Sequence, residues 1–165
     1  MRRRSGFSLP ELLVVLGVLV ITAAVSMPSL LGAIGNSDFN AAARQVTGDA
    51  RFARSLAVSR GGYYRLQTLD TRYRVERSNS GTSWPASTAQ MGANADVISN
   101  WQDLSRLYGG VTIQSVSTVD GAIFNSTGAS VSSSNTPRSV SITLLRPDGT
   151  TKVIQIDPVG NVKTS

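Results

Sequence analysis

The sequence has no cysteine and no histidine among its 165 residues. These absences exclude a disulfide framework, a zinc finger, a cysteine nucleophile, a Ser-His-Asp triad and an imidazole proton shuttle. No pair of carboxylates and no Ser-Lys spacing indicates another kind of catalysis. We therefore expect a protein that is not an enzyme and that needs no metal and no cofactor.

Acidic residues are also scarce, because 10 Asp and Glu stand against 16 Lys and Arg and leave a formal net charge of +6. Arg2, Arg3 and Arg4 account for half of this excess. The remaining excess is modest, so the net charge alone does not identify a nucleic-acid-binding protein.

Charged side chains are absent altogether from residues 12–37. Residues 7–27 are predominantly apolar, with Glu11 as their one charged side chain. As a helix they would be roughly 32 Å long, which matches a hydrocarbon core of about 30 Å. The three arginines precede this helix, so the positive-inside rule places residues 1–6 in the cytoplasm and the C-terminal domain across the membrane.

A cleaved secretory signal peptide is the alternative interpretation of this segment, with Ala23, Ala24 or Ser26 near the cleavage site. Two features argue against it. The apolar run is longer than the usual h-region of roughly 7–15 residues. Glu11 lies near the start of the run, where a carboxylate gives a signal peptide no advantage and costs up to about 2.5–3.5 kcal/mol on insertion scales.

The start of the apolar run resembles the prepilin cleavage motif of type IV pilins and type II secretion pseudopilins. The matching residues are Gly6, Phe7, Ser8, Leu9, Pro10, Glu11, Leu12 and Leu13. The resemblance implies that a prepilin peptidase cuts between Gly6 and Phe7 on the cytoplasmic side and that Phe7 becomes N-methylated. Counted from Phe7, Glu11 is the fifth residue and Pro28 the twenty-second, and both positions match the family's pattern.

The resemblance also implies a role for Glu11 in assembly. Cleavage creates an α-amino group on Phe7, which would face Glu11 of a neighbouring subunit and compensate its charge. Such buried pairs add little net stability, but removing one partner costs several kcal/mol, so Glu11 would determine register and recruitment. Pro28 removes one helical hydrogen bond and is predicted to be a hinge where the helix bends or partly unwinds.

A second helix is predicted over residues 29–60, ending at Gly61-Gly62. Its apolar positions recur with helical periodicity and form one stripe rich in small residues, which suits a helix laid against a sheet. The stripe consists of Phe39, Ala42, Ala43, Val46, Ala50, Ala53 and Ala57.

Two hairpins are predicted after this helix. The first joins residues 63–69 and 72–77 through Asp70-Thr71. Its register pairs Leu66 with Val75, Thr68 with Tyr73, Arg65 with Glu76 and Gln67 with Arg74, which sorts apolar and charged side chains onto opposite faces. The second joins residues 139–145 and 151–156 through Pro147-Asp148-Gly149.

The segments between the hairpins give weaker signals. Residues 111–116 and 122–124 are short strand candidates, and residues 78–100 are expected to form a long loop with Trp84 and Trp101 as candidate anchors. These patterns alone predict an α+β domain, and the resemblance to pilins implies a type IV pilin-like fold with a long N-terminal membrane-spanning helix packed on antiparallel β-sheets. The expected parts are a cytoplasmic leader (1–6), a transmembrane helix (7–28) and a periplasmic globular domain (29–165) with a helix over 29–60 and a β-rich part over 63–165.

Three later stretches narrow the resemblance to the GspH/FimT family of minor pseudopilins and minor pilins. They are the arginine-containing helix end (51–61), the strand leading into Phe124 and Gly128, and the final stretch 157–163. The FimT branch is associated with DNA uptake through a Gly-Arg-x-Arg segment near its C-terminus. The matching stretch here is Gly160-Asn161-Val162-Lys163, in which asparagine replaces the first arginine and lysine the second.

Six cations are candidates for DNA contact: Arg44, Arg51, Arg54, Arg72, Arg74 and Lys163. Tyr63, Tyr64 and Tyr73 are interleaved with arginines and would suit base stacking. The plainer interpretation is that Arg65 pairs with Glu76, while the helix arginines form a solvated face or contact other subunits.

These observations predict a minor pilin or pseudopilin, a structural subunit of a type II secretion pseudopilus or a type IV pilus, supporting protein secretion or pilus assembly. Its expected partners are the prepilin peptidase, other pilins or pseudopilins of the filament, and the inner-membrane assembly platform. We expect it in the bacterial inner membrane and in filaments. The alternative is a DNA-binding minor pilin that serves competence for natural transformation. An exported domain with a conventional signal peptide is a third possibility.

Overall fold

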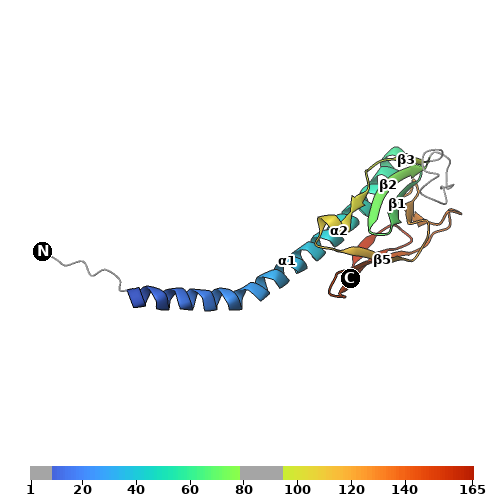
Figure 1. The fold of residues 1–165 in the computed structure, drawn as a ribbon. Helices are drawn as coiled ribbons and strands as arrows, with labels where there is room; N and C mark the ends of the chain where they lie inside the picture. The colour runs from blue at the N-terminus through green and yellow to red at the C-terminus, as the bar shows by residue number, and fades with distance from the viewer. Residues whose placement is uncertain (1–8, 79–94) are drawn as a thin grey trace. The chain divides into compact units, whose positions relative to one another are not determined.

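A computed structural model of the chain describes residues 9–78 and 95–165, with the side chains of 27–32 and 95 also outside the description (Figure 1). The chain divides into two compact units, Met1–Ser37 and Asp38–Ser165. The first unit contains the apolar segment. The second unit contains the remainder of α1 and all of the described strands, and we call it the domain.

Helix α1 (Leu9–Arg60) begins in the first unit. Its segment Leu9–Ser26 is long and apolar enough to cross a membrane by length and composition, and none of it is buried. The hydroxyl of Thr22 donates to the carbonyl of Val18 at 2.9 Å, and that of Ser26 donates to the carbonyl of Thr22 at 2.8 Å. These polar groups are thus satisfied within the helix, as a hydrocarbon environment requires.

The part of α1 inside the domain uses the predicted stripe. All seven stripe residues, from Phe39 to Ala57, are at most 3% exposed, so this prediction is confirmed. Leu56, which was not predicted, joins them at 7%. The helix ends at Arg60, as expected, because Gly61 and Gly62 adopt φ angles of 68° and 95° that L-residues rarely adopt.

Two antiparallel sheets pack with α1 around one core (Figure 1). Sheet A has the order β3-β2-β1-β6-β7, and β4 also pairs with β2. Its strands are β1 (Tyr64–Leu69), β2 (Arg72–Ser78), β3 (Ala95–Val97), β4 (Gln102–Asp103), β6 (Ala122–Phe124) and β7 (Ser130–Val131). A short helix, α2 (Leu104–Leu107), follows β4 and is capped by the Asp103 side chain.

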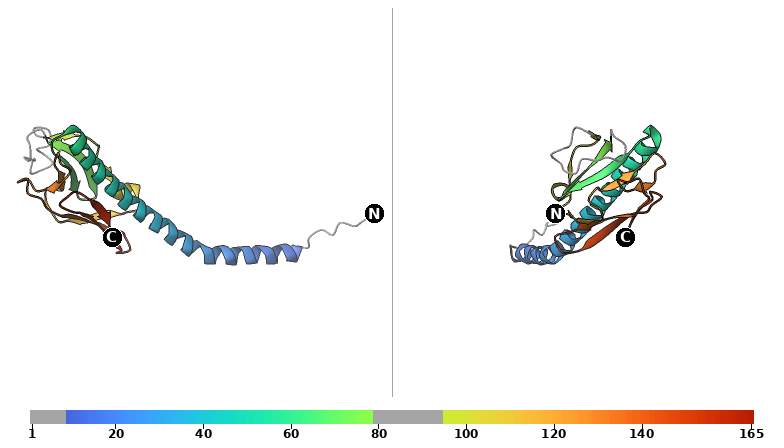
Figure 2. Two further views of the ribbon diagram at one scale, coloured as in Figure 1. Left: turned by 180° about the vertical axis from the view of Figure 1, so that it is seen from behind. Right: turned by 90° about the vertical axis from the view of Figure 1, so that its right-hand side faces the viewer.

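Sheet B has the order β10-β9-β8-β5. Its strands are β5 (Thr112–Val116), β8 (Val140–Leu145), β9 (Thr151–Ile156) and β10 (Val162–Thr164). In the right-hand view of Figure 2, the green strands of sheet A and the red strands of sheet B flank the domain part of α1. The observed fold is the expected α+β arrangement of an N-terminal apolar helix followed by antiparallel sheets.

Both predicted hairpins are present. The β1–β2 pairing joins Leu66 to Val75, Thr68 to Tyr73, Arg65 to Glu76 and Gln67 to Arg74, which confirms the predicted register. Asp70 at the turn has a φ of 51°, within the range that two-residue hairpin loops require. In the β8–β9 turn, Gly149 has a φ of 88° and donates its N–H to the carbonyl of Arg146 at 2.9 Å.

The prediction of an uninterrupted loop over residues 78–100 was wrong at its end, where β3 pairs with β2. Strands β4, β7 and β10 and helix α2 were also missed. Each has only two to four residues, too few to show a periodicity. Trp84 lies outside the described residues, whereas Trp101 packs beneath the guanidinium of Arg74, which lies 4.5 Å from the centre of its ring.

Candidate functional site: an apolar helix and a basic groove

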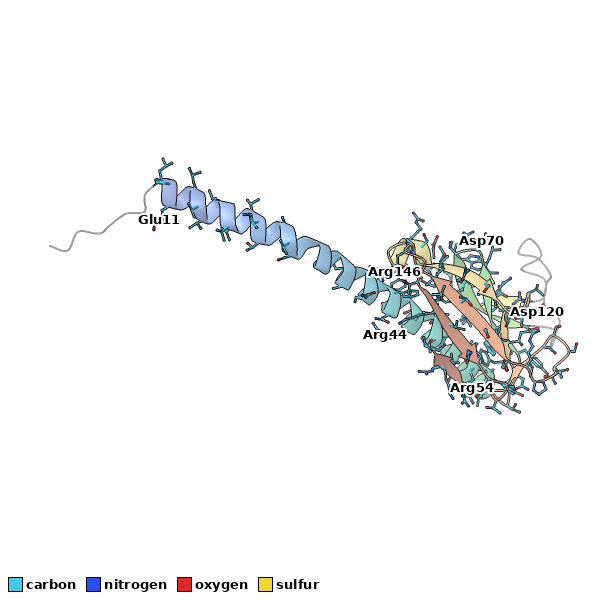
Figure 3. All side chains as sticks on the ribbon, turned by 90° about the horizontal axis from the view of Figure 1, so that it is seen from below. Glu11, Arg44, Arg54, Asp70, Asp120 and Arg146 are labelled. Carbon is cyan, nitrogen blue, oxygen red and sulfur yellow. The ribbon has the colours of Figure 1, made fainter. Side chains whose placement is uncertain are left out.

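Glu11 lies in the first turn of α1, at the N-terminal end of the described chain (Figure 3). The helix dipole favours a carboxylate in this position. The following side chains are large, aliphatic and exposed, for example Leu12 at 55% and Val20 at 67%. This segment therefore presents to its surroundings an apolar surface with one acid near its start.

The structure gives little information on the predicted cleavage site and on the predicted hinge at Pro28. Gly6 and Phe7 lie outside the described residues. The helix is unbroken through Pro28, so the described backbone has no unwound turn at that position, and the hinge stays a prediction.

The domain carries a groove of about 750 Å³ between the end of α1 and β10. We call it the basic groove. It is lined by Arg51, Arg54, Ser55, Val58, Ser59, Asn161, Val162 and Lys163. Three of the six predicted cations, Arg51, Arg54 and Lys163, therefore come together, although more than 100 residues separate the helix from the strand.

Backbone carbonyls hold the two groove arginines in place. Arg51 donates from Nη2 to the carbonyl of Val162 at 3.0 Å. Arg54 donates from Nε to the carbonyl of Gly128 at 3.0 Å and from Nη2 to that of Val159 at 3.1 Å. A guanidinium has five N–H donors, so each arginine retains donors for another acceptor. Neutral carbonyls orient these guanidinium groups without cancelling their charge.

A tight turn brings Lys163 to the groove. Gly160 has a φ of 83°, and a Cβ added there would lie 1.9 Å from the carbonyl oxygen of Gly128, so the close approach of these two loops requires glycine. Asp157 accepts hydrogen bonds from the backbone N–H of Asn161 at 2.8 Å and from its Nδ2 at 2.9 Å. The backbone hydrogen bond is the main reason that the pKa of Asp157 lies below its ordinary value, and Lys163 contributes less.

The other predicted cations lie elsewhere. Arg44 is exposed on α1 and does not line the basic groove. Arg72 and Arg74 belong to β2, where both lie over the ring of Trp101. Arg74 is buried and donates to Glu76 at 2.6 Å, which does not suit contact with a phosphate.

The predicted Arg65–Glu76 pair is confirmed, with Arg65 Nε 2.8 Å from Glu76 Oε2. Both side chains are buried, and desolvation lowers the pKa of Arg65 despite the neighbouring carboxylate. The sequence predicted that Arg65 and Glu76 lie on one face of the hairpin, but it did not predict that this face is buried.

The proposed base-stacking role does not fit two of the three tyrosines. Tyr64 and Tyr73 are completely buried. Tyr73 donates its hydroxyl to Asp49 at 2.7 Å, and burial, followed by this hydrogen bond, raises its pKa. Their side chains belong to the core under sheet A, so they present no ring face to a nucleic acid.

Together, the exposed apolar helix that continues into a two-sheet domain and the acid in its first turn define a pilin-like protein. Residues 42–160 match the family described as "Type II transport protein GspH", and residues 1–27 match the "Prokaryotic N-terminal methylation motif". The chain belongs to the GspH family and is a minor pilin or pseudopilin.

The fold also resembles two crystal structures of the type IV minor pilin FimU from Pseudomonas aeruginosa PAO1. One aligns with a TM-score of 0.53 and 16% identity over 79% of this chain and 90% of that chain. The second crystal form aligns with a TM-score of 0.51 and 18% identity over 76% and 91%. No curated protein matches this sequence. The likeness to FimU shows the pilin fold, and the family match shows the role.

Proposed function

We propose that this minor pilin or pseudopilin is a non-enzymatic subunit that enters the bacterial inner membrane through α1, with residues 1–6 in the cytoplasm and 29–165 in the periplasm. A prepilin peptidase cuts between Gly6 and Phe7. The mature chain then joins other pilins or pseudopilins in a filament built on the inner-membrane assembly platform. The match to the methylation motif and the position of the arginines support this order of events.

The observation that carries the proposal is the exposed apolar segment Leu9–Ser26 with Glu11 in its first turn. A carboxylate in the hydrocarbon region is costly, and charges at such positions mark functional contacts. Cleavage before Phe7 supplies an amino group close to the same end of the helix. Pairing this amine with Glu11 of a neighbouring subunit stabilises packed helices in one register, because a shifted register leaves a charge buried in an apolar surface.

Replacing Glu11 tests this role directly. We expect Glu11→Ala to be cleaved normally but to lose at least about tenfold in incorporation, since stranding one member of a buried pair costs about 3–5 kcal/mol. Immunoblotting of sheared filaments measures incorporation, and Glu11→Asp, which keeps the charge, is the matched control. Undiminished incorporation of Glu11→Ala would rule out the proposed pairing.

N-terminal sequencing of the mature protein tests the processing step. A mature chain that starts at Phe7 supports prepilin cleavage. A start after Ala23, Ala24 or Ser26 would instead show a conventional signal peptide.

Uptake of DNA is the second candidate function, favoured by the gathering of Arg51, Arg54 and Lys163 on one groove. Against it stand the burial of Tyr64, Tyr73 and Arg74. A gel-shift assay with the full-length protein at several salt concentrations tests it. DNA binding should weaken by roughly one log unit per log unit of salt for each phosphate contacted, and no retardation at low salt would exclude this function.

The machine that the subunit serves can be assigned in the host. A deletion strain that loses secreted proteins while keeping its pili supports a type II secretion pseudopilus. A strain that loses pili while keeping secretion supports a type IV pilus.

A further inference from the structure

The basic groove holds three cations that form no ion pair with the described acidic residues. No acidic side chain lines it, and none of the ion pairs within residues 9–78 and 95–165 involves Arg51, Arg54 or Lys163. Asp157 lies beside the groove and interacts electrostatically with Lys163, so it offsets part of that charge, but it forms no ion pair with Arg51 or Arg54 among the described residues. An anionic group entering the groove would therefore meet cations whose charge is still available.

Two of these cations are preorganised. The backbone carbonyls that hold Arg51 and Arg54 restrict their side chains before any ligand arrives, so binding costs less conformational entropy than at a free arginine. Their remaining N–H donors match the geometry of a carboxylate. Lys163, which is exposed, adds a third charge on the facing wall.

The uncharged residues that line the basic groove indicate which groups, besides anionic ones, a ligand would carry. Val58 and Val162 line it, and Val58 is 55% exposed. Among the described residues no aromatic side chain lines the groove, so these residues offer a nucleobase no stacking platform. A groove of about 750 Å³ with three cations also offers few phosphate contacts, and phosphate contacts supply much of the affinity of a protein for DNA. Acidic and small aliphatic side chains on one short peptide fit these walls better than a nucleic acid does.

We propose that the basic groove binds a short acidic segment of another protein, with carboxylates on Arg51, Arg54 and Lys163 and an aliphatic side chain against Val58. That the protein is a neighbouring filament subunit rests on the proposed function, whereas the binding itself does not. This surface would give the domain a contact with its neighbour that is separate from the pairing of apolar helices at Glu11.

Fluorescence anisotropy of the full-length protein in detergent micelles tests the proposal. The probe is a labelled hexapeptide of alternating Val and Glu, and the same peptide with Gln in place of Glu shows any binding to the micelle. Lys163→Gln is the main variant, because this side chain is exposed. Arg44→Gln is the matched control, since it removes one exposed positive charge from α1 outside the groove.

We expect the Glu peptide to bind and the Gln peptide not to bind. Lys163→Gln should weaken binding by about fivefold to tenfold, the scale of one charge-assisted hydrogen bond, and Arg44→Gln by less than about twofold. Arg51→Gln should weaken binding similarly to Lys163→Gln, with an unfolding curve recorded in parallel because it also loses the hydrogen bond to Val162.

Three outcomes would overturn the proposal. The first is no binding of the Glu peptide at low salt. The second is an equal loss with Arg44→Gln and Lys163→Gln, which would show diffuse attraction only. The third is that a 20-base-pair DNA duplex binds in a Lys163-dependent manner while the peptide does not. The peptide assay needs no filament, so an absence of peptide binding would not contradict the proposed assembly role of Glu11. Likewise, normal incorporation of Glu11→Ala would not contradict the proposed binding of peptides to the basic groove.

Discussion

The two parts of helix α1 differ in the size and the exposure of their apolar side chains. From Leu9 to Ser26, large aliphatic side chains surround the helix and are exposed. After Asp38, one face carries mostly alanine, and that face is completely buried. Large aliphatic side chains suit a helix surface that meets lipid tails, whereas small ones let the sheets of the same chain approach the helix closely. In α1, side-chain size therefore changes where the helix passes from the exposed apolar segment into the packed domain.

The same contrast applies to two glutamates. Glu11 lies in the first turn of the exposed apolar segment, where a carboxylate is costly in a hydrocarbon environment and marks a functional contact. Glu76 is completely buried in sheet A, and the fold itself supplies Arg65 and Arg74 at 2.8 and 2.6 Å. One glutamate should thus affect assembly and the other the stability of the domain.

The largest expected effect is that of Glu76→Ala. It leaves Arg65 and Arg74 buried without their carboxylate and should lower the free energy of unfolding of the domain by about 3–5 kcal/mol. Denaturant titration of the full-length protein in detergent, followed by tryptophan fluorescence, measures this change. Glu11→Ala is the comparison and should leave the same transition within about 0.5 kcal/mol. Equal transitions for the two variants would contradict the contrast between them.

A smaller effect is expected when the same substitution is placed in the two parts of α1. Ala53→Leu adds a large side chain at a completely buried position and should destabilise the domain by about 1–3 kcal/mol. Ala24→Leu adds it to the exposed apolar segment and should leave the unfolding transition unchanged. If Ala53→Leu were tolerated as well as Ala24→Leu, the close packing of helix and sheets would not need alanine.

The smallest expected effect concerns the turn that presents Lys163. The pKa of Asp157 lies below its ordinary value, so the carboxylate stabilises the turn above the ordinary aspartate pKa of about 3.9 and loses this contribution as the pH falls through the lowered value. The difference in melting temperature between the wild type and Asp157→Asn should therefore shrink between pH 6 and pH 2. A difference that stays constant with pH would show that ionisation of Asp157 does not stabilise the turn.

Much of the fold could be predicted because its signals are local. The helical recurrence of small apolar residues from Phe39 to Ala57 identified the buried face, and alternation in residues 63–77 identified the hairpin register. The family resemblance came from a motif of consecutive residues at the N-terminus. Strand β6 was expected although it has only three residues, whereas β7 and β10 were missed, because their pairing partners define them rather than their own pattern.

The basic groove was predictable only in part. Arg51, Arg54 and Lys163 stood out by their charge, but so did Arg72 and Arg74, which the fold places in sheet A. Residue order and composition by themselves determined the apolar helix and its acid, because hydropathy and periodicity act over a few turns. The resemblance of the N-terminal motif indicated the family. Tertiary structure alone decided which cations share a surface and which are buried in ion pairs. Both outcomes depend on contacts between residues distant in the chain, and such contacts form only when the core packs.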